Sequence, residues 1–328
     1  MPGLVPGIHV LAQGNTWMGR TSPAMTAGVR EAMRKVAWIG LGTMGFPMAG
    51  HLKTRGHHDV TVFNRTRAKA EAWVRQFGGR VAATPAEAAE GAAFIFTCVG
   101  NDDDLRSVTL DPDGAFNALR AGAVFVDHTT ASATIARELY DAARARGAGA
   151  LDAPVSGAQS GAEGGNLTVM VGGDEEDFRN AKPVIESYAR AVNLIGPVGS
   201  GQLTKMVNQI CIGGLIEALA EALHFAKAAK LDVAKVIDTI SKGAAQSWQM
   251  DNRWKTMIEG KFDFGFAVDW VRKDFAMCFE EARRNGASLP VTAIVDQFYA
   301  DIQEMGGGRW DTSSLIALLE HRRQDVSL

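Results

Sequence analysis

The feature of this chain that most constrains its fold is a short apolar run that leads through three glycines into a helical pattern. The run, Val36 to Gly40, is of strand type, and the helical pattern extends from Phe46 to Arg55. The glycines between them follow the spacing GxGxxG, in which the first permits a tight turn, the second lets the backbone approach a pyrophosphate and the third lets the helix pack on the strand. The amides at the helix start would hold the phosphates. The segment therefore predicts a dinucleotide site formed by Gly40, Leu41, Gly42, Thr43, Met44 and Gly45.

The residues after the next expected strand, 59–63, indicate which nucleotide binds. An NAD site usually places an acid at this point, where it accepts hydrogen bonds from the ribose 2′-hydroxyl. This chain has Asn64, Arg65 and Thr66 there, and Asp59 lies at the opposite end of the strand. A guanidinium beside amide and hydroxyl groups suits a 2′-phosphate. We therefore expect NADP(H) to be preferred, with NAD(H) as the alternative.

The pattern of elements changes once along the chain. Expected strands alternate with helices up to about residue 197, and only helical patterns follow. This order predicts an α/β Rossmann-type doubly wound, mostly parallel sheet, followed by an all-α C-terminal domain joined by a long interdomain helix over 202–229. The expected organisation is a disordered extension over 1–34, a dinucleotide-binding domain over 35–197 and a helical substrate and oligomerisation domain over 198–328. Further strands are expected at 93–99, 123–127, 151, 168–171 and 191–195, and further helices at 67–77, from 84, and at 132–146, 175–188, 233–242, 269–284, 290–305 and 313–321.

Composition excludes several classes of function. A net charge of −3 gives no electrostatic reason to expect nucleic acid or an anionic membrane as a partner, and no apolar run approaches the ~20 residues that span a bilayer. The three cysteines are far apart, so we expect buried reduced thiols in a cytoplasmic protein. No cluster of metal-ligating residues is found, and we expect no metal.

The first 34 residues resemble a transit peptide in composition, being rich in small residues and arginine with no acid before Glu31. However, Met18, Met25 and Met33 offer later starts. A disordered extension, or an overextended reading frame, is favoured over a targeting signal.

One lysine of the long helix has neighbours that suit carbonyl chemistry. Lys205, Asn208 and Gln209 stand at i, i+3 and i+4, so their side chains share one face of a helix. An ammonium flanked by carboxamides can give a proton to a carbonyl oxygen while the amides hold the substrate. A solvated surface lysine is the alternative interpretation of this segment alone.

Two further motifs accompany this lysine. The small residues of Asp152 to Ala162 would expose backbone amides after a strand, and together with the Ser156 hydroxyl these would make a nest for an anion. The pair Lys273 and Asp274 lies in an expected helix. Alone, such a pair usually belongs to a solvated face.

Together these four motifs resemble the β-hydroxyacid dehydrogenase family, the group of 3-hydroxyisobutyrate dehydrogenase, tartronate semialdehyde reductase and glyoxylate/succinic semialdehyde reductase. The chain has GLGTMGFPMA for the family's GLGxMGxxMA, DAPVSGA for DAPVSGG, GSGQLTK for GxGxxxK and KDF for KDL. The resemblance covers about Lys35 to His321 and keeps the order and spacing of the motifs.

The resemblance implies an NAD(P)-dependent oxidoreductase that interconverts a small β-hydroxy acid and its semialdehyde, as a homodimer or homotetramer. Lys205 would be the general acid in reduction and the base in oxidation. Lys273 would close over the nicotinamide, and Trp248 would form a pocket wall, with a core tryptophan as the alternative. The substrate carboxylate would be bound by Ser156, Gly157 and Ala158, its polar substituents by Asn208 and Gln209, and the nicotinamide ribose by Val99, Gly100 and Thr130.

Departures from the family pattern leave the substrate open. The family often has Leu-Pro where this chain has Val99 and Gly100, and a glycine where it has Ala158. The sequence KxxNQ is closer to the tartronate semialdehyde reductases than to 3-hydroxyisobutyrate dehydrogenases, whereas the aromatic residues Trp248, Phe264 and Phe266 favour an apolar substituent. A 3-hydroxyisobutyrate dehydrogenase-like activity is expected, and the alternatives are tartronate (2-hydroxy-3-oxopropionate) or succinic semialdehyde/glyoxylate reduction. Imine reductases generally lack the lysine, and a non-catalytic binding relative would have lost it or the glycine turn.

Overall fold

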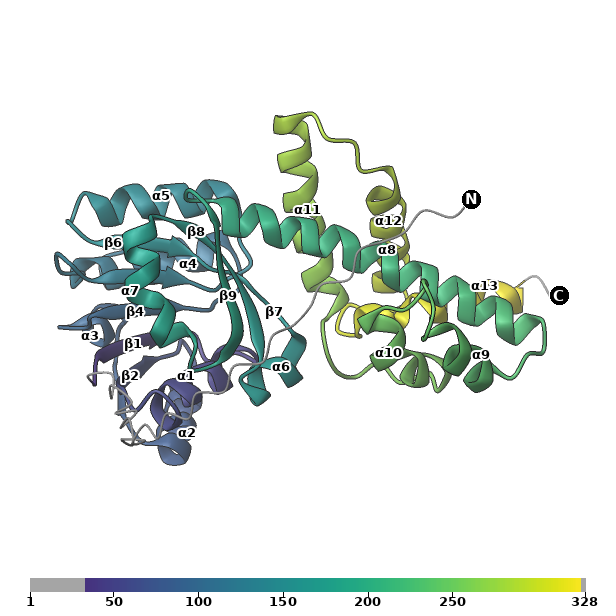
Figure 1. Ribbon diagram of the computed structural model, residues 1–328, viewed down its shortest axis with the longest axis horizontal. Coiled ribbons are helices and arrows are strands. Elements are labelled where there is room, and N and C mark those ends of the chain that lie inside the picture. Colours follow the sequence, from purple (N-terminus) through teal and green to yellow (C-terminus); the bar gives the residue numbers. More distant parts are fainter. Residues whose placement is uncertain (1–32, 326–328) are drawn as a thin grey trace, which may run out of the picture. The chain divides into compact units, whose positions relative to one another are not determined.

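The computed structural model describes residues 33–325 and shows one sheet followed by a set of helices (Figure 1). The predicted extension over 1–34, apart from Met33 and Arg34, lies outside the described residues. The strands are β1 (Lys35–Ile39), β2 (Asp59–Phe63), β3 (Arg80–Val81), β4 (Phe94–Thr97), β5 (Val124–Asp127), β6 (Gly149–Asp152), β7 (Val155–Ser156), β8 (Leu167–Gly173) and β9 (Ala189–Gly196).

The predicted fold class is confirmed by the sheet topology. The strand order is β3-β2-β1-β4-β5-β6-β8-β7, with β9 beside β8. Pairs from β3 to β6 are parallel, β8 is antiparallel to both β6 and β7, and β9 is parallel to β8. The chain order reverses between β1 and β4. In doubly wound sheets such a reversal opens a crevice at the carboxyl ends of the strands, where ligands bind.

Helices cover both faces of the sheet because alternate residues of each buried strand point to opposite sides. In β1, Val36 and Trp38 join one apolar cluster with α1 and α2, and Ala37 and Ile39 join a second cluster with α3, α4 and α5. These helices and the two that follow are α1 (Gly45–Thr54), α2 (Arg67–Phe77), α3 (Pro85–Ala89), α4 (Asp102–Thr109), α5 (Ala133–Arg144), α6 (Ala158–Gly164) and α7 (Glu175–Ile185).

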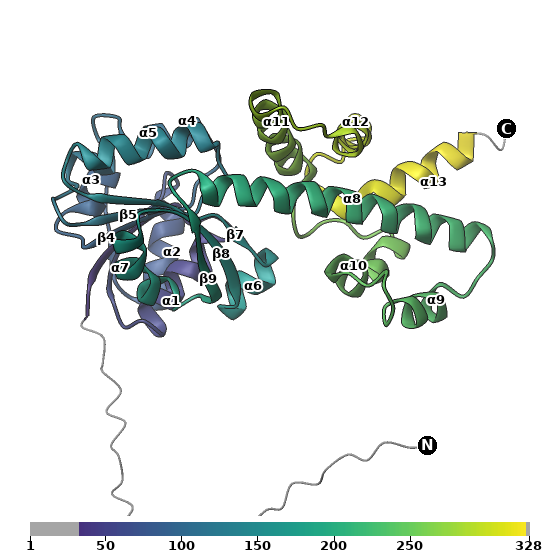
Figure 2. The same ribbon diagram turned by 45° about the horizontal axis from the view of Figure 1, so that its top comes forward.

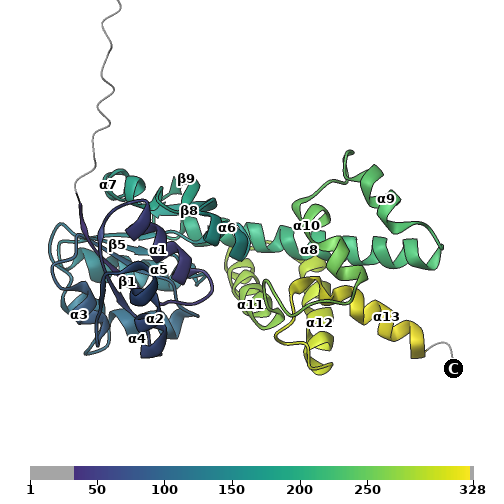
Figure 3. The ribbon, with the colours of Figure 1, turned by 90° about the horizontal axis from the view of Figure 1, so that it is seen from below.

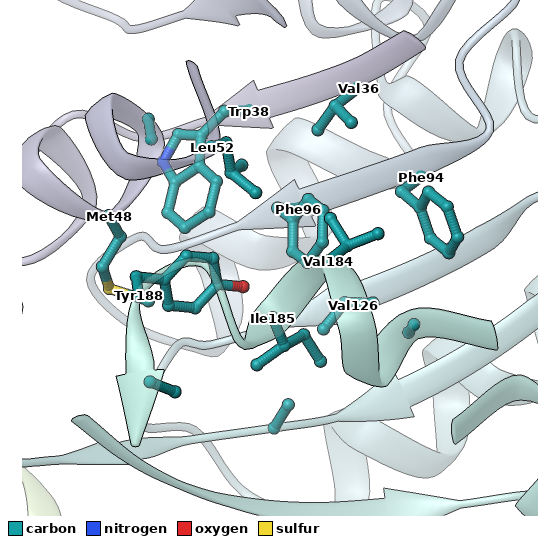
Figure 4. Packing of buried hydrophobic residues seen from close by; sticks show 14 of the residues in the cluster. Val36, Trp38, Met48, Leu52, Phe94, Phe96, Val126, Val184, Ile185 and Tyr188 are labelled. Atoms are coloured by element: carbon teal, nitrogen blue, oxygen red, sulfur yellow. The ribbon is translucent and has the colours of Figure 1, made fainter. Parts of the chain in front are cut away.

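An aromatic cluster packs beneath the glycine-rich turn. Trp38 lies against Phe96 and Tyr188 (Figure 4), and His128 stacks between them with its ring centroid 5.8 Å from Trp38. Trp38 also donates from Nε1 to the Gly40 carbonyl at 2.9 Å. The turn is therefore held from below by a fully buried ring.

The C-terminal helices are arranged around one long helix, α8 (Ser200–Ala228). Figures 2 and 3 show α9 and α10 on one side of α8, and α11 and α12 on the other. By length and composition alone α8 could cross a membrane. However, six other helices, α5 and α9 to α13, pack on it, and Leu219, Leu223 and Phe275 form a common buried cluster there, as in a core helix. The later helices are α9 (Val233–Ile240), α10 (Trp248–Ile258), α11 (Val268–Asn285), α12 (Pro290–Glu304) and α13 (Leu315–Asp325).

Some expectations about elements and burial are wrong. The sequence patterns missed α4, α6 and α10. Helix α4 is short and polar and buries only Leu105 and Thr109, and α6 consists mostly of small residues. All three cysteines are free, as expected, but only Cys278 is buried: Cys98 is partly buried and Cys211 is exposed.

Candidate active site

The sheet and the helices enclose a cavity of about 1270 Å³ at the crevice beside β1 and β4. Of the residues predicted for the site, all but two line this cavity. The exceptions are Leu41 and Gly45, which are buried. The residues that line it are Gly40, Gly42, Thr43, Met44, Asn64, Arg65, Thr66, Val99, Gly100, Thr130, Ser156, Gly157, Ala158, Lys205, Asn208, Gln209, Trp248 and Lys273.

The glycine-rich turn fits a dinucleotide phosphate. A Cβ on Gly42 would meet no atom within 4 Å, so its backbone faces open space in the cavity. A Cβ on Gly45 would lie 2.1 Å from the Gly40 carbonyl oxygen, which explains why glycine allows the helix to pack here. Helix α1 has no side-chain hydrogen bond at its N-cap, Met44. Within the first turn of α1, the Phe46 amide donates to the Gly42 carbonyl at 3.0 Å and Pro47 has no amide hydrogen. The amides that could meet an anion are therefore those of the turn before Phe46.

Of the residues after β2, Asn64 holds the loop in place and Arg65 carries its positive charge. Asn64 accepts a hydrogen bond from the Leu41 amide at 2.9 Å and donates to the Thr66 carbonyl at 3.0 Å. Both ends of its amide are thus used to hold the loop against the glycine-rich turn. Arg65 is 88% exposed, and its Nη1 lies 3.2 Å from Asp104 Oδ1. The guanidinium is the group here that could meet a phosphate.

Lys205 is buried, so the interpretation as a solvated surface lysine is wrong. Only 8% of the residue is exposed, yet it lines the cavity. Burial lowers the pKa of Lys205 to about 8, because desolvation disfavours the ammonium; Asp274 acts in the opposite direction and Lys273 in the same direction. A lysine with this pKa exchanges a proton near neutral pH, as an acid–base group must.

A chain of hydrogen-bonded side chains runs from the cavity wall to Asp274, which interacts electrostatically with this lysine. Ser156 Oγ donates to Asn208 Oδ1 at 3.3 Å, Asn208 Nδ2 donates to Gln209 Oε1 at 2.8 Å, and Gln209 Nε2 donates to Asp274 Oδ2 at 2.6 Å. Gln209 is buried, with both ends of its amide engaged within the protein. The chain fixes the orientation of Asn208, whose side chain is only partly buried.

Lys273 connects α11 to the loops after β4 and β5. Its Nζ donates to the Gly100 carbonyl at 3.1 Å and to the Thr130 carbonyl at 2.5 Å, and it lies 3.1 Å from Asp274 Oδ1. The structure therefore brings together three residues that the sequence assigned to the nicotinamide end of the cofactor.

Asp274 and Asp152 are functional candidates that sequence reasoning did not assign. Asp274 is buried; desolvation raises its pKa, and the nearby Lys273 and Lys205 oppose that rise. It was recognisable as the neighbour of Lys273 in the KDF motif, and it provides the negative charge near Lys205.

Asp152 holds the start of α8. Its Oδ1 accepts from the Gly199 amide at 2.7 Å and its Oδ2 from the Gln202 amide at 2.8 Å. A Cβ on Gly201 would lie 2.5 Å from the Asp152 and Met170 carbonyl oxygens. The helix can approach the sheet this closely because position 201 has no side chain, and Lys205 follows one turn later.

Trp248 lines the cavity and is 45% exposed, so the alternative of a core tryptophan is wrong. The guanidinium carbon of Arg253 lies 5.0 Å from its ring centroid, and Arg253 Nε lies 3.2 Å from the buried Asp311. This wall of the cavity therefore combines an aromatic ring with an arginine whose charge is balanced by Asp311. In the described part of the chain, no group of three or more histidine, cysteine or acidic residues could hold a metal ion.

Comparisons with known proteins agree with this geometry. Residues 35–196 match the family described as the NAD binding domain of 6-phosphogluconate dehydrogenase, and residues 199–319 match that described as NAD-binding of NADP-dependent 3-hydroxyisobutyrate dehydrogenase.

Individual proteins resemble the chain over most of its length. An uncharacterised oxidoreductase of Shewanella frigidimarina is 62% identical, over 89% of this chain and 100% of that protein. A probable 3-hydroxyisobutyrate dehydrogenase-like protein 1 of Arabidopsis thaliana is 40% identical, over 90% of this chain and 87% of that protein. The structure of 3-hydroxyisobutyrate dehydrogenase from Mycobacterium tuberculosis, with L-serine, has a TM-score of 0.78 and 29% identity, covering 88% of this chain and 99% of that one.

Proposed function

Because this chain belongs to the β-hydroxyacid dehydrogenase family, we propose that it interconverts a small β-hydroxy acid and its semialdehyde with NADP(H), in the manner of a 3-hydroxyisobutyrate dehydrogenase. The observation that carries the proposal is the buried Lys205, which lines the same cavity as the glycine-rich turn and has its pKa lowered to about 8 by desolvation. An oxidoreductase of this family needs one proton donor beside its hydride site, and Lys205 supplies that group.

The residues of the cavity divide the chemistry between them. When bound, the nicotinamide supplies or accepts the hydride. Lys205 Nζ donates a proton to the aldehyde oxygen during reduction and takes the hydroxyl proton during oxidation. This proton transfer contributes about 10²–10⁴ in rate. The carboxylate form of Asp274 raises the pKa of Lys205 and so favours the protonated lysine.

The substrate would be held between the Ser156 loop and α8. Ser156, Gly157 and Ala158 line the cavity together with Asn208, and the backbone at Gly157 and Ala158 has positive φ values of 136° and 55°. Amides in such a turn, beside a serine hydroxyl, suit a carboxylate. Gln209 is a positioning residue in this proposal, because its amide holds Asn208 and Asp274 rather than pointing to a ligand.

Two substrate classes fit this cavity. Trp248 and Phe266 line it, which favours the apolar substituent of a 3-hydroxyisobutyrate-like substrate. The polar chain from Ser156 through Asn208 favours instead a short hydroxylated aldehyde such as tartronate semialdehyde. We place the 3-hydroxyisobutyrate-like class first because Trp248, which lines the cavity, is 45% exposed and so offers an apolar surface to the substrate.

Preference for NADP(H) over NAD(H) rests on Arg65. The loop after β2 has no acid that could accept the ribose 2′-hydroxyl, and Arg65 and Lys69 both line the cavity there. A charge-assisted contact with the 2′-phosphate is worth about 1.5–3 kcal/mol, which corresponds to one to two decades in affinity. Arg65→Ala should therefore weaken NADPH binding much more than NADH binding, and equal losses would mean that Arg65 does not read the phosphate.

The proposed activity is tested by a screen of the purified protein. NADPH and NADH are each assayed with methylmalonate, tartronate and succinic semialdehydes and with glyoxylate. Lys205→Ala should lose about 10²–10⁴ in kcat and still bind NADPH with unchanged Kd. Lys227→Ala provides the matched control, because Lys227 lies on the same helix and pairs with Glu320. Near-normal turnover of Lys205→Ala would remove the acid–base assignment.

A further inference from the structure

We infer that Asp104 is a specificity-determining residue for the nucleotide: its carboxylate competes with the 2′-phosphate for Arg65 and so narrows the preference for NADPH. The inference rests on the proposed use of Arg65 to read that phosphate. It concerns an acid on α4, the helix that follows β4, and not a residue of the loop after β2.

The position of Asp104 is fixed by the start of α4. Asn101 is the N-cap, and its Oδ1 accepts a hydrogen bond from the Asp104 amide at 2.8 Å. This places the Asp104 side chain in the first helical turn, where it lines the cavity opposite the loop after β2. There its Oδ1 lies 3.2 Å from Arg65 Nη1.

A glycine makes room for this carboxylate. A Cβ built on Gly100 would lie 2.5 Å from Asp104 Oδ2, closer than real side chains approach. Gly100 is not among the glycines with positive φ, so its backbone would accept another residue. What the glycine provides here is therefore space, and the Asp104 carboxylate occupies it.

The two neighbouring acids have other partners. Asp102 accepts hydrogen bonds from the amide and hydroxyl of Ser132, at 2.9 and 2.5 Å. Asp103 lies 3.4 Å from Arg106, and its side chain is almost fully exposed. Of the three acids in this turn, Asp104 is the one that both lines the cavity and pairs with Arg65.

The consequence for nucleotide choice follows from charge. A bound 2′-phosphate would bring about two negative charges to a guanidinium that already has a carboxylate beside it. Either the phosphate displaces Asp104 or it binds next to a like charge, and both cost affinity. A nucleotide with a 2′-hydroxyl pays neither cost, so Asp104 weakens NADPH binding selectively.

The test measures the Kd of NADPH and of NADH for the intact protein by isothermal titration calorimetry at low salt. Asp104→Asn keeps the size of the side chain and removes its charge. It should tighten NADPH binding about three- to tenfold, the range expected for removing one like charge at the protein surface, and leave NADH binding unchanged. The gain should shrink at high ionic strength. Asp103→Asn is the matched control, because it removes the same charge from the same turn without changing the cavity.

Two further variants make the outcome decisive. Gly100→Ala should displace the carboxylate and move the NADPH/NADH affinity ratio in the same direction as Asp104→Asn. In an Arg65→Ala background, Asp104→Asn should give little gain. Weaker or unchanged NADPH binding in Asp104→Asn, an equal gain for both nucleotides, or a full gain without Arg65 would each overturn the inference. If Arg65→Ala alone leaves NADPH binding intact, it is instead the proposed reading of the phosphate by Arg65 that fails.

Discussion

The Asp152 carboxylate accepts a hydrogen bond from the Gln202 amide at 2.8 Å, three residues before Lys205. A second bond comes from the amide of Gly199, the N-cap residue of α8, so a carboxylate of β6 caps the start of this helix. The acid that begins the DAPVSGA motif therefore fixes the helix on which the proposed acid–base lysine lies. Two motifs that stand about fifty residues apart in the sequence form one structural unit.

Removing this cap should lower both stability and activity. Asp152→Ala leaves two buried amides without their acceptor, which we expect to cost about 2 kcal/mol or more in the free energy of unfolding. Because the cap positions Lys205, kcat should also fall. Urea unfolding and steady-state kinetics measure the two effects. Asp232→Ala is the control, since it removes the exposed cap of α9 and should leave kcat unchanged. Equal losses of kcat in Asp152→Ala and Asp232→Ala would contradict the proposal that the Asp152 cap positions Lys205.

The pKa of Lys205, lowered to about 8 by desolvation, predicts opposite pH profiles for the two directions of the reaction. Reduction needs the ammonium, so its rate should be level at low pH and fall as pH rises above about 8. Oxidation needs the neutral amine and should rise with pH to a plateau above the same point. Initial rates in each direction across pH 6 to 10 would test this. Parallel profiles in the two directions would show that another group titrates.

Asp274 should control where that break in the profile falls. Its charge raises the pKa of Lys205, so Asp274→Asn should move the fall in reduction rate to lower pH. The asparagine oxygen can still accept from Gln209, which preserves the geometry. Glu280→Gln, on the exposed side of the same helix, should leave the profile in place. A break that stays or moves upward in Asp274→Asn would refute the assignment.

Association of copies of the chain is expected through α8. Val207 and Phe225 are 61% and 70% exposed and lie 18 residues apart, a whole number of helical turns. Between them Gly214, Ala218 and Ala222 continue a stripe of small residues, of which the two alanines are exposed. Exposed apolar stripes of this kind mark protein interfaces.

We therefore predict a homo-oligomer at micromolar concentration, measured by light scattering. Ala218→Glu should dissociate the oligomer, because a charged side chain would be buried between the α8 helices of two copies. Ala218→Ser retains a small residue and should leave the assembly intact. A monomeric wild-type protein would contradict the prediction.

The sequence was sufficient wherever the determining pattern is local. Glycine spacing between a strand and a helix identified the turn at Gly40, where φ is 99°, because the spacing itself is local. One of its steric needs is local as well, since a Cβ on Gly45 would lie 2.1 Å from the Gly40 carbonyl oxygen. Helix α4 was missed because few of its residues are apolar and because its N-cap, Asn101, is followed by three aspartates, a sequence that resembles a loop. Polarity does not explain why α10 was missed, since five of its 11 residues are apolar.

The site was predictable as a set of residues but not as a set of contacts. Lys205 was identified from its neighbours, while its burial depends on helices that follow later in the chain. The hydrogen bond from Gln209 to Asp274 joins residues 65 positions apart. The periodicity of apolar residues along a sequence cannot predict a contact between such distant residues. Substrate-facing and structural amides therefore could not be distinguished in the sequence.

The close approach of α8 to the sheet has a mechanical consequence. Gly201 and Asp152 attach the first turn of α8 to β6 and β8, so Lys205 is anchored to the sheet that carries the glycine-rich turn, although the sequence places it among the helices. In any opening of the cavity, the lysine would stay in register with the nucleotide. Helix α11 is attached to the same elements, because Lys273 donates to the Gly100 and Thr130 carbonyls and Asp274 accepts from Gln209 of α8. The acid–base group would thus keep its position beside the hydride site.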